Sequence, residues 1–480
     1  MYWTLAIRHL LVRPGRAAVL LTGYALGVAV MIVLLSVGDA MLSQSRDVSL
    51  VGGGDLTALP HGVDVDAMRS GGLTGMFFGI SGARFVSREL LGGVRHATIV
   101  AAVSPVLEQK LLALRVGDTT WTVRAGGEIP SAARAAAAAL HVIGGAWSDT
   151  PADAAWRQPA PQEFFDEIDR FHRPATRDST WAEWHYFNVV VSEQEWWYIT
   201  LLIGGDLGSD RWGGQVLVTH RRVGGEYQRF TMSAPRNTVI FDTARADVVV
   251  GASSVVQRHG VYHIRGRSGG ATFDFTLTPA PRRYFPPVEL GDDHAASGYV
   301  VPALSATATG RLCADGVCVD LHGAAAYHDH NWGTWRAVIW EWGAGRSDRH
   351  ALLYGGVLPD GRAISGAPLF LALEDSLGVQ QIFRFDAVTR FGARDLPGIP
   401  GIVVPDSLQI IAARGDDTLR IGVRVVDVVG SRSAAAGPGR IFLQMRGRWR
   451  VHGTAGGAAV ADSGTGFFET WVRSGRPANR

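Results

Sequence analysis

From residue 179 onward, the chain is a succession of short segments in which apolar and polar residues alternate. FNVVVSE, QVLVTHR, TFDFTLTP and LRIGVRVVDVV are examples, and Gly, Asp-Gly or Pro interrupts them every 8–15 residues. A period of two is typical of half-buried β-strands, and this punctuation is typical of antiparallel sandwiches and barrels. Because about 300 residues is too many for one small barrel, we predict two, over 179–335 and 336–480.

The strongest helical signal is an apolar run near the N-terminus. Residues 17–38 carry no charge. A run of this length can cross a hydrocarbon core of about 30 Å as a helix. Three arginines, the last of them Arg16, precede the run, whereas the first basic residue after it is Arg46. The positive-inside rule therefore places the N-terminus in the cytoplasm. We expect residues 1–43 to provide a single-pass anchor in the cell membrane, with the bulk of the chain periplasmic or extracellular. A cleaved signal peptide is the alternative.

The two cysteines flank a turn signal. Cys313 and Cys318 lie in CADGVC, where Asp315-Gly316 is a strong signal for a two-residue β-hairpin. A turn there would place the cysteines opposite each other in a non-hydrogen-bonded pair, in which side chains approach closely. We predict a disulfide, which fits an oxidising compartment; two buried thiols in a reducing cytosol are the alternative.

Two further segments separate the apolar run from the strands. The basic LAIRHLLVRPGR before the run and the stretch GGGDLTALPHGVDV after it resemble the beginning of an FtsX-like ABC-transporter permease. We therefore interpret residues 44–145 as a small, permease-like extracytoplasmic α/β segment. No later apolar run of 18 residues follows, so the other helices of such a permease are missing. Residues 146–178 are rich in Pro and charge, which predicts a linker with a short helix.

Three aromatic-rich stretches stand out among the predicted strands. They are WAEWHYFN at 181–188 with EWWY at 195–198, YHDHNWG at 327–333 with WEWG at 340–343, and GTGFFETW at 464–471. If YHDHNWG lies in a strand, its side chains alternate between two faces. One face carries His328, His330 and Trp332, and the other carries Tyr327, Asp329 and Asn331. We expect one of these faces to look into a barrel or into the junction between barrels.

These stretches resemble the carotenoid 1,2-hydratase (hydroxyneurosporene synthase) family, including its AttH-like members. The resemblance covers residues 175–475 and rests chiefly on YHDHNWG, with the Glu-Trp-x-Tyr blocks and the late Gly-x-Gly-Phe-x-Glu segment in support. It implies two lipocalin-like barrels side by side and hydration of an isoprenoid double bond. AttH-like members tend to lie beside ABC-transporter components, so it also implies a possible transporter partner.

Hydration of an alkene needs an acid that protonates carbon and a π face or carboxylate that stabilises the resulting cation. The family's catalytic His-x-Trp pair maps onto His330 as the acid and Trp332 as the wall of the site. The family's later Tyr-x-Asp pair has its nearest counterpart in Tyr354, with Gly356 at the acidic position.

Asp329 or Glu341 could supply the missing acid. The other residues predicted to contact a ligand are aromatic or polar members of the same stretches: Trp184, Tyr186, Trp197, Tyr327, His328, Asn331 and Trp340.

Other interpretations of these motifs remain open. YHDHNWG could be a structural polar plug that closes the base of a barrel. A metal could be shared by His328 and His330 only, with a third ligand from elsewhere, because adjacent strand residues point apart. Glu469 is expected to make a structural pair. We predict no metal and no cofactor.

Two functions are therefore weighed. The first is a membrane-anchored hydratase-like enzyme that protonates the C=C bond of an isoprenoid or other apolar lipid and adds water. The alternative is a non-catalytic lipid-binding accessory subunit of an ABC transporter. The net charge of +2 and the scattered basic residues argue against a nucleic-acid partner. No Gly-x-x-x-x-Gly-Lys loop occurs, so the chain is not a transporter ATPase.

Overall fold

The computed structural model describes residues 14–45, 80–92, 95, 97–136, 148–153, 166, 169–172, 174, 177–222, 224, 227–290, 297–334, 338–359, 369–396, 398–432 and 439–473. The chain divides into two compact units. One comprises Met1–Phe78 and Val100–Asp153, and the other comprises Gly79–Ile99 and Ala154–Arg480.

The described residues of the first unit form two helices, a hairpin and a short 3-10 turn. Its elements are α2 (Pro14–Ser45), β1 (Val106–Val116), β2 (Thr119–Glu128), α5 (Pro130–Ala135) and η2 (Pro151–Asp153). Strands β1 and β2 pair antiparallel, and Pro130 begins α5, where its fixed φ suits the first turn of a helix. Over the residues whose side chains are described, no helix combines the length and apolar character of a membrane span.

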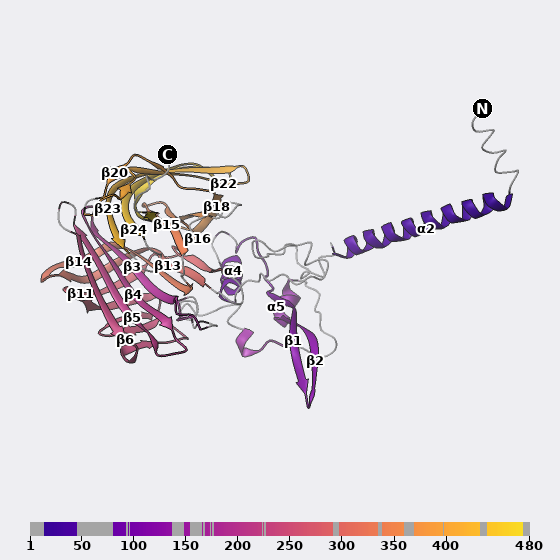
Figure 1. Cartoon of the computed structure of the whole chain (residues 1–480), viewed down its shortest axis with the longest axis horizontal. Helices are drawn as coiled ribbons and strands as arrows, with labels where there is room; N and C mark the ends of the chain where they lie inside the picture. Colours follow the sequence, from indigo (N-terminus) through magenta and orange to yellow (C-terminus); the bar gives the residue numbers. More distant parts are fainter. Residues whose placement is uncertain are drawn as a thin grey trace. The chain divides into compact units, whose positions relative to one another are not determined.

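Twelve antiparallel strands of the second unit form one sheet. They are β3 (Trp181–Ser192), β4 (Glu195–Asp206), β5 (Arg211–Arg222), β6 (Tyr227–Pro235), β7 (Val239–Phe241), β8 (Asp247–Val250), β9 (Ser253–Arg258), β10 (Val261–Ser268), β11 (Ala271–Pro279), β12 (Phe285–Leu290), β13 (Ser297–Ala314) and β14 (Val317–Thr334). The order is β6-β5-β4-β3-β14-β13-β11-β10-β9-β8-β7, with β12 added beside β13. Figure 1 shows β3, β4, β5 and β6 side by side in this sheet.

This sheet curls until its two ends meet. Gly214 in β5 faces Val239 of β7 and Val250 of β8; a Cβ added at Gly214 would lie 2.5 Å from the Val250 side chain and 3.0 Å from that of Val239. A residue with no side chain therefore lets strands from opposite ends of the sheet approach closely, as in a nearly closed barrel.

A second sheet follows and closes on itself. Its strands are β15 (Val338–Arg346), β16 (Ala351–Pro359), β17 (Leu369–Asp375), β18 (Gly378–Phe385), β19 (Thr389–Phe391), β22 (Ser407–Arg414), β23 (Asp417–Arg432), β24 (Arg440–Ala455) and β25 (Ala458–Arg473). The order is β18-β17-β16-β15-β25-β24-β23-β22-β19, and Arg384 of β18 pairs with Ala413 of β22 to complete the ring. A small ladder, β20 (Arg394–Asp395) with β21 (Val403–Val404), lies beside it.

Each barrel has its own apolar core. In β11, for example, Ala271, Phe273 and Phe275 are buried, whereas Thr272 and Asp274 between them are exposed. The alternation in the sequence thus corresponds to an inner and an outer face, and the predicted fold of two lipocalin-like antiparallel barrels is confirmed.

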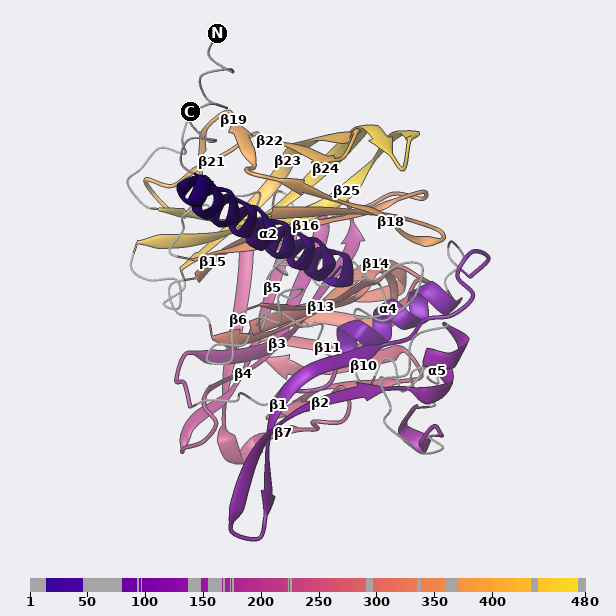
Figure 2. The ribbon, with the colours of Figure 1, turned by 90° about the vertical axis from the view of Figure 1, so that its right-hand side faces the viewer.

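A third apolar cluster fills the junction between the barrels. The rings of Phe285 and Phe370, one from each barrel, stack with their centroids 5.0 Å apart. Arg221 of β5 also forms an ion pair with Asp427 of β23 at 2.7 Å. Figure 2 shows the strands β15–β25 of the second barrel stacked on those of the first. Helix α4 (Ile80–Gly92) belongs to this unit, and its Glu89 accepts a 2.5 Å hydrogen bond from the Tyr284 hydroxyl.

The predicted disulfide is present. Cys313 and Cys318 are bonded and lie opposite each other in the β13–β14 hairpin, one pair beyond Ala314 and Val317. Asp315 and Gly316 at the tip have φ of 47° and 83°, the two left-handed residues that a type I′ turn requires.

Candidate functional site

Strand β14 carries YHDHNWG and separates two environments. It pairs with β3, so that Asp329 lies opposite Tyr186 and His330 lies opposite His185. As the alternation predicted, Tyr327 belongs to the apolar cluster of the junction. The His328 ring, in contrast, stacks on Phe187 of the first barrel core, with ring centroids 4.3 Å apart. The two faces therefore form two separate polar clusters.

On the junction face, Asp329 lies at the centre of a short hydrogen-bond chain. The Trp342 indole donates to the Tyr327 hydroxyl at 3.0 Å, and that hydroxyl donates to Asp329 Oδ2 at 2.8 Å. The Asn331 amide donates to Asp329 Oδ1 at 2.6 Å. Burial and the neighbouring Glu469 raise the pKa of Asp329 to about 7.

Glu469 of β25 faces the same junction from the second barrel. Its Oε1 accepts hydrogen bonds from the Tyr186 hydroxyl and the Gln444 amide, each at 3.1 Å, and its Oε2 accepts one from the Trp340 indole at 3.4 Å. Burial raises the pKa of Glu469 to about 7, although these three donors favour the ionised form. Near pH 7 this carboxyl can therefore both release and accept a proton.

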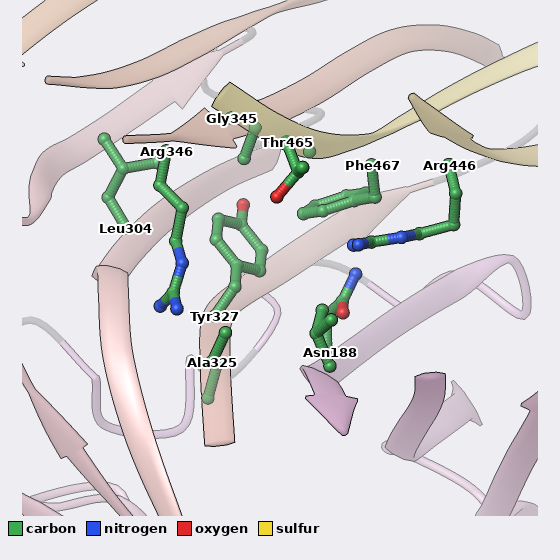
Figure 3. A pocket seen from close by; sticks show the side chains of 13 residues that line it. Asn188, Leu304, Ala325, Tyr327, Gly345, Arg346, Arg446, Thr465 and Phe467 are labelled. Atoms are coloured by element: carbon green, nitrogen blue, oxygen red, sulfur yellow. The ribbon is translucent and has the colours of Figure 1, made fainter. Parts of the chain in front are cut away.

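Aromatic rings near Glu469 line a small cavity of the junction. The Phe467 ring lies two residues along β25 from Glu469 and packs edge-on against the Tyr327 ring at 4.8 Å. Both rings line a cavity of about 40 Å³, enough for a single water molecule. Figure 3 shows Arg346 and Arg446, which also line the cavity, on opposite sides of Tyr327.

Inside the first barrel, His330 is held between two carboxylates. Its Nδ1 lies 2.8 Å from Asp169 Oδ1 and its Nε2 lies 2.7 Å from Glu183 Oε1. Burial alone would lower the pKa of His330, but contacts with Asp169 and Glu183 raise it to about 9. His330 is fully buried and lies on the strand face opposite Asp329. The structure therefore separates the predicted acid His330 from the junction cavity.

Trp332 also lies on this inner side. Its indole stacks on the His172 ring at 3.7 Å, nearly parallel, and packs against Gly298 of β13. The His172 backbone N–H donates to both oxygens of Glu183 at 2.9 Å. Two groups of ligands result, and each could hold a metal ion. One is the fully buried group of Asp169, His185 and His330, and the other comprises the partly buried His172 with the buried Glu183 and His330.

The remaining predicted residues are divided among the cores. Trp184, Tyr186 and Trp340 lie at the junction, as does Tyr327. Trp197 lies in the first barrel core, stacked on His220 at 4.1 Å. Tyr354 lies in the second barrel core against Phe468, so the structure does not bring it to Asp329. Glu341 forms an ion pair with Arg390 and accepts a hydrogen bond from Thr470 at 2.7 Å.

Sequence reasoning left Asp169, His172, Glu183 and His185 of the inner cluster out of the predicted site. Asp169 and His172 fall in the segment 146–178, which we predicted to be a linker, yet Asp169 is fully buried against His328 and His330. No periodic pattern marks that segment, so nothing in the sequence pointed to it. Glu469, expected to make a structural pair, has hydrogen-bond donors but no ion-pair partner among the described residues. Its place in GTGFFETW was the available signal.

Comparisons with solved structures identify proteins of similar architecture. An AttH-like protein from Nitrosomonas europaea has a TM-score of 0.44 and 18% identity, over 60% of this chain and 92% of that one. Kievitone hydratase from Nectria haematococca has a TM-score of 0.42 and 12% identity, over 60% and 88%. CghA has a TM-score of 0.43 and 11% identity, over 62% and 90%.

These neighbours include an AttH-like protein and a hydratase, as the motif resemblance predicted. Each of these similarities is a similarity of fold. The resemblance of the N-terminal region to an FtsX-like permease is not supported. No protein-family model and no curated protein matches the chain.

Proposed function

We propose that the chain is a hydratase-type enzyme that adds water across a C=C bond of an apolar ligand at the junction of its two barrels. The observation that carries this proposal is Glu469, a buried carboxyl whose pKa is about 7 and which lies among aromatic rings beside the junction cavity. The proposal moves the acid from His330, which faces the barrel interior, to the junction.

The chemistry follows from this arrangement. Protonated Glu469 donates its proton to one alkene carbon, and the π electrons form the new C–H bond. The other carbon becomes a tertiary cation, which the faces of Trp340, Phe467 and Tyr327 stabilise. A water molecule then bonds to that carbon and returns a proton to the Glu469 carboxylate. Acid and base are thus the same group, and no cofactor is consumed.

The cavity also favours a ligand with an anionic end. Arg446 is 6% exposed, its guanidinium lies 5.6 Å from the Trp196 ring centroid, and it has no ion-pair partner among the described residues. A buried guanidinium of this kind recognises carboxylate or phosphate. Since the cavity measures about 40 Å³ and small-molecule sites usually exceed about 300 Å³, the ligand enters only when side chains at the junction move apart. An unsaturated isoprenoid or other lipid with an acidic head group fits these requirements.

We further propose that the enzyme is anchored in the cell membrane close to its lipid supply. The support is the uncharged run 17–38, which falls within helix α2 and whose described side chains include the exposed Val30, Ile32 and Leu34. The Cys313–Cys318 disulfide supports an exported body. Protease added to spheroplasts is expected to degrade the barrels; complete protection would overturn this topology.

Mass spectrometry of isotope-labelled products tests the reaction. The full-length protein in detergent is incubated with a total lipid extract in ¹⁸O-water, together with Glu469→Gln and, as a matched control, the exposed Glu193→Gln. Lipids that gain one labelled water with wild type and Glu193→Gln, but not with Glu469→Gln, are the expected result. Labelling that survives in Glu469→Gln refutes the assigned acid. Absence of product, with a lipid that co-purifies, would favour the non-catalytic accessory subunit.

A further inference from the structure

The polar cluster inside the first barrel has a geometry that the proposed hydration does not use. Asp169, His185 and His330 each offer one ligand atom, and these three atoms lie within 4.8 Å of one another. Asp169 Oδ1 lies 2.8 Å from His330 Nδ1 and 3.8 Å from His185 Nδ1. The three side chains are at most 2% exposed, so bulk water cannot reach them to form hydrogen bonds.

These same three atoms lack hydrogen bonds of acceptable geometry. Among the described residues, Asp169 Oδ1, His185 Nδ1 and His330 Nδ1 are all buried without a hydrogen-bond partner. An unsatisfied buried polar group costs about 1–3 kcal/mol, and more when it is charged. Three such atoms that converge on one point need a shared partner, and a cation placed between them would satisfy all three.

The outer nitrogen of His330 is already occupied, as a metal ligand requires, whereas Nε2 of His185 has no hydrogen-bond partner among the described residues. His330 Nε2 lies 2.7 Å from Glu183 Oε1, and the His172 backbone N–H holds Glu183 in place. A proton on Nε2 leaves Nδ1 as the free ligand atom, which is the carboxylate–histidine–metal arrangement. Glu183 is therefore a positioning residue for His330.

In His328 the two ring nitrogens have the opposite roles, because Nδ1 and not Nε2 faces an outer hydrogen-bond acceptor. Its Nδ1 lies 3.0 Å from the Tyr186 carbonyl oxygen, which can only accept, so Nδ1 must carry the hydrogen. Its Nε2, 3.2 Å from Asp169 Oδ2, is then a lone pair that faces a carboxylate. Two acceptors repel each other at that distance, unless the ring gains a second proton or a cation lies between them.

We propose that this cluster is a binding site for one divalent transition-metal ion such as Zn²⁺, held by Asp169, His185 and His330. Imidazole nitrogens with one carboxylate oxygen are a ligand set that suits Zn²⁺ and its neighbours in the first transition row. Three protein ligands leave one position of a tetrahedral site for a further ligand. The ion ties Asp169 to strands β3 and β14 through His185 and His330, while His328 contacts the other oxygen of Asp169.

Metal content and metal-dependent stability test this site independently of any hydratase activity. The full-length protein, purified without a histidine tag, is expected to hold roughly one metal ion per chain by elemental mass spectrometry. Removal with a chelator is expected to lower Tm, and added Zn²⁺ to restore it. Co²⁺ in place of Zn²⁺ should give visible absorption bands typical of imidazole and carboxylate coordination.

Variants distinguish ligands from ordinary core histidines. His185→Gln is expected to lose the metal, and Glu183→Gln to weaken binding by about 10- to 100-fold. The matched control is His220→Gln, a buried histidine of the same barrel that contacts Glu195 and Gln228, which should retain the metal. Circular dichroism confirms that each variant folds. A wild-type protein that contains no metal, and whose Tm does not respond to Zn²⁺, Mn²⁺ or Co²⁺, would overturn the proposal and show that protons alone satisfy the cluster.

Discussion

The Tyr186 hydroxyl donates a 3.1 Å hydrogen bond to Glu469 Oε1 across the junction between the barrels. The two residues are 283 positions apart in the sequence, and one lies in β3 of the first barrel while the other lies in β25 of the second. The ionisation of Glu469 therefore depends on both barrels, which explains why the proposed acid needs two lipocalin-like domains rather than one.

Replacement of Tyr186 by Phe removes one donor to the Glu469 carboxylate. Because that donor favours the ionised form, the pKa of Glu469 is expected to rise above about 7 in Tyr186→Phe. The loss of the hydrogen bond should also cost about 1 kcal/mol of folding free energy. The pH dependence of the carboxylic-acid stretch in infrared spectra measures the first effect. Tyr198→Phe, which removes a buried hydroxyl not bonded to Glu469, should leave that titration nearly unchanged.

The pH dependence of stability should report the same carboxyl. The pKa of Glu469 is about 7 in the folded protein and 4.5 ordinarily, so the folded state retains a proton that the unfolded state releases. The free energy of unfolding of wild type relative to that of Glu469→Gln is therefore highest below about pH 4.5. This difference declines as the pH rises to 7. The decline should amount to roughly 3 kcal/mol at most.

Urea unfolding of both proteins between pH 4 and 8 measures this difference. Glu193→Gln provides the control, because the Glu193 side chain is exposed. Parallel stability curves for wild type and Glu469→Gln would show that Glu469 has an ordinary pKa.

Much of the fold could be predicted from the sequence, because each barrel strand repeats a local pattern. The LRIGVRVVDVV stretch became β23, with Leu419, Ile421 and Val423 buried and the residues between them exposed. The turn signal Asp315-Gly316 fixed the register of its hairpin and hence the disulfide. Alternation along YHDHNWG also separated its two faces correctly.

The residues of the candidate sites were harder to predict, because residues far apart in the sequence come into contact only when the barrels fold. Asp169 contacts His328 from 159 positions away, and it comes from a segment with no strand pattern. The sequence also left open which of the two faces of YHDHNWG meets the junction between the barrels. A family motif named His330 as the acid, yet only the packing of β14 against β3 shows that His330 points into a barrel while Asp329 points toward Glu469.

Gly298 is predicted to be indispensable for the packing of Trp332. A Cβ at position 298 would lie 2.4 Å from the Trp332 ring and 2.8 Å from the Val288 carbonyl oxygen, which cannot rotate away. Gly298→Ala is therefore expected to cost about 1–3 kcal/mol of folding free energy, seen as a lower urea midpoint. Gly422→Ala is the control, since nothing lies within 4 Å of the added Cβ in β23. Equal midpoints for the two variants would contradict this packing.

Arg446 should show opposite effects on stability and on ligand binding. Its guanidinium is buried beside Trp196 without an ion-pair partner among the residues described, and burial lowers its pKa. Replacement by an apolar side chain of similar length removes this desolvation cost, so Arg446→Met should keep or increase the free energy of unfolding. The same change removes the group that would bind an anionic head group, so affinity for such a lipid should fall by about tenfold or more.

Urea unfolding and mass spectrometry of co-purified lipid measure the two effects, with Arg448→Met, an exposed neighbour in β24, as control. A destabilised Arg446→Met that still retains the lipid would show that this guanidinium is structural and that the ligand carries no anion at the junction.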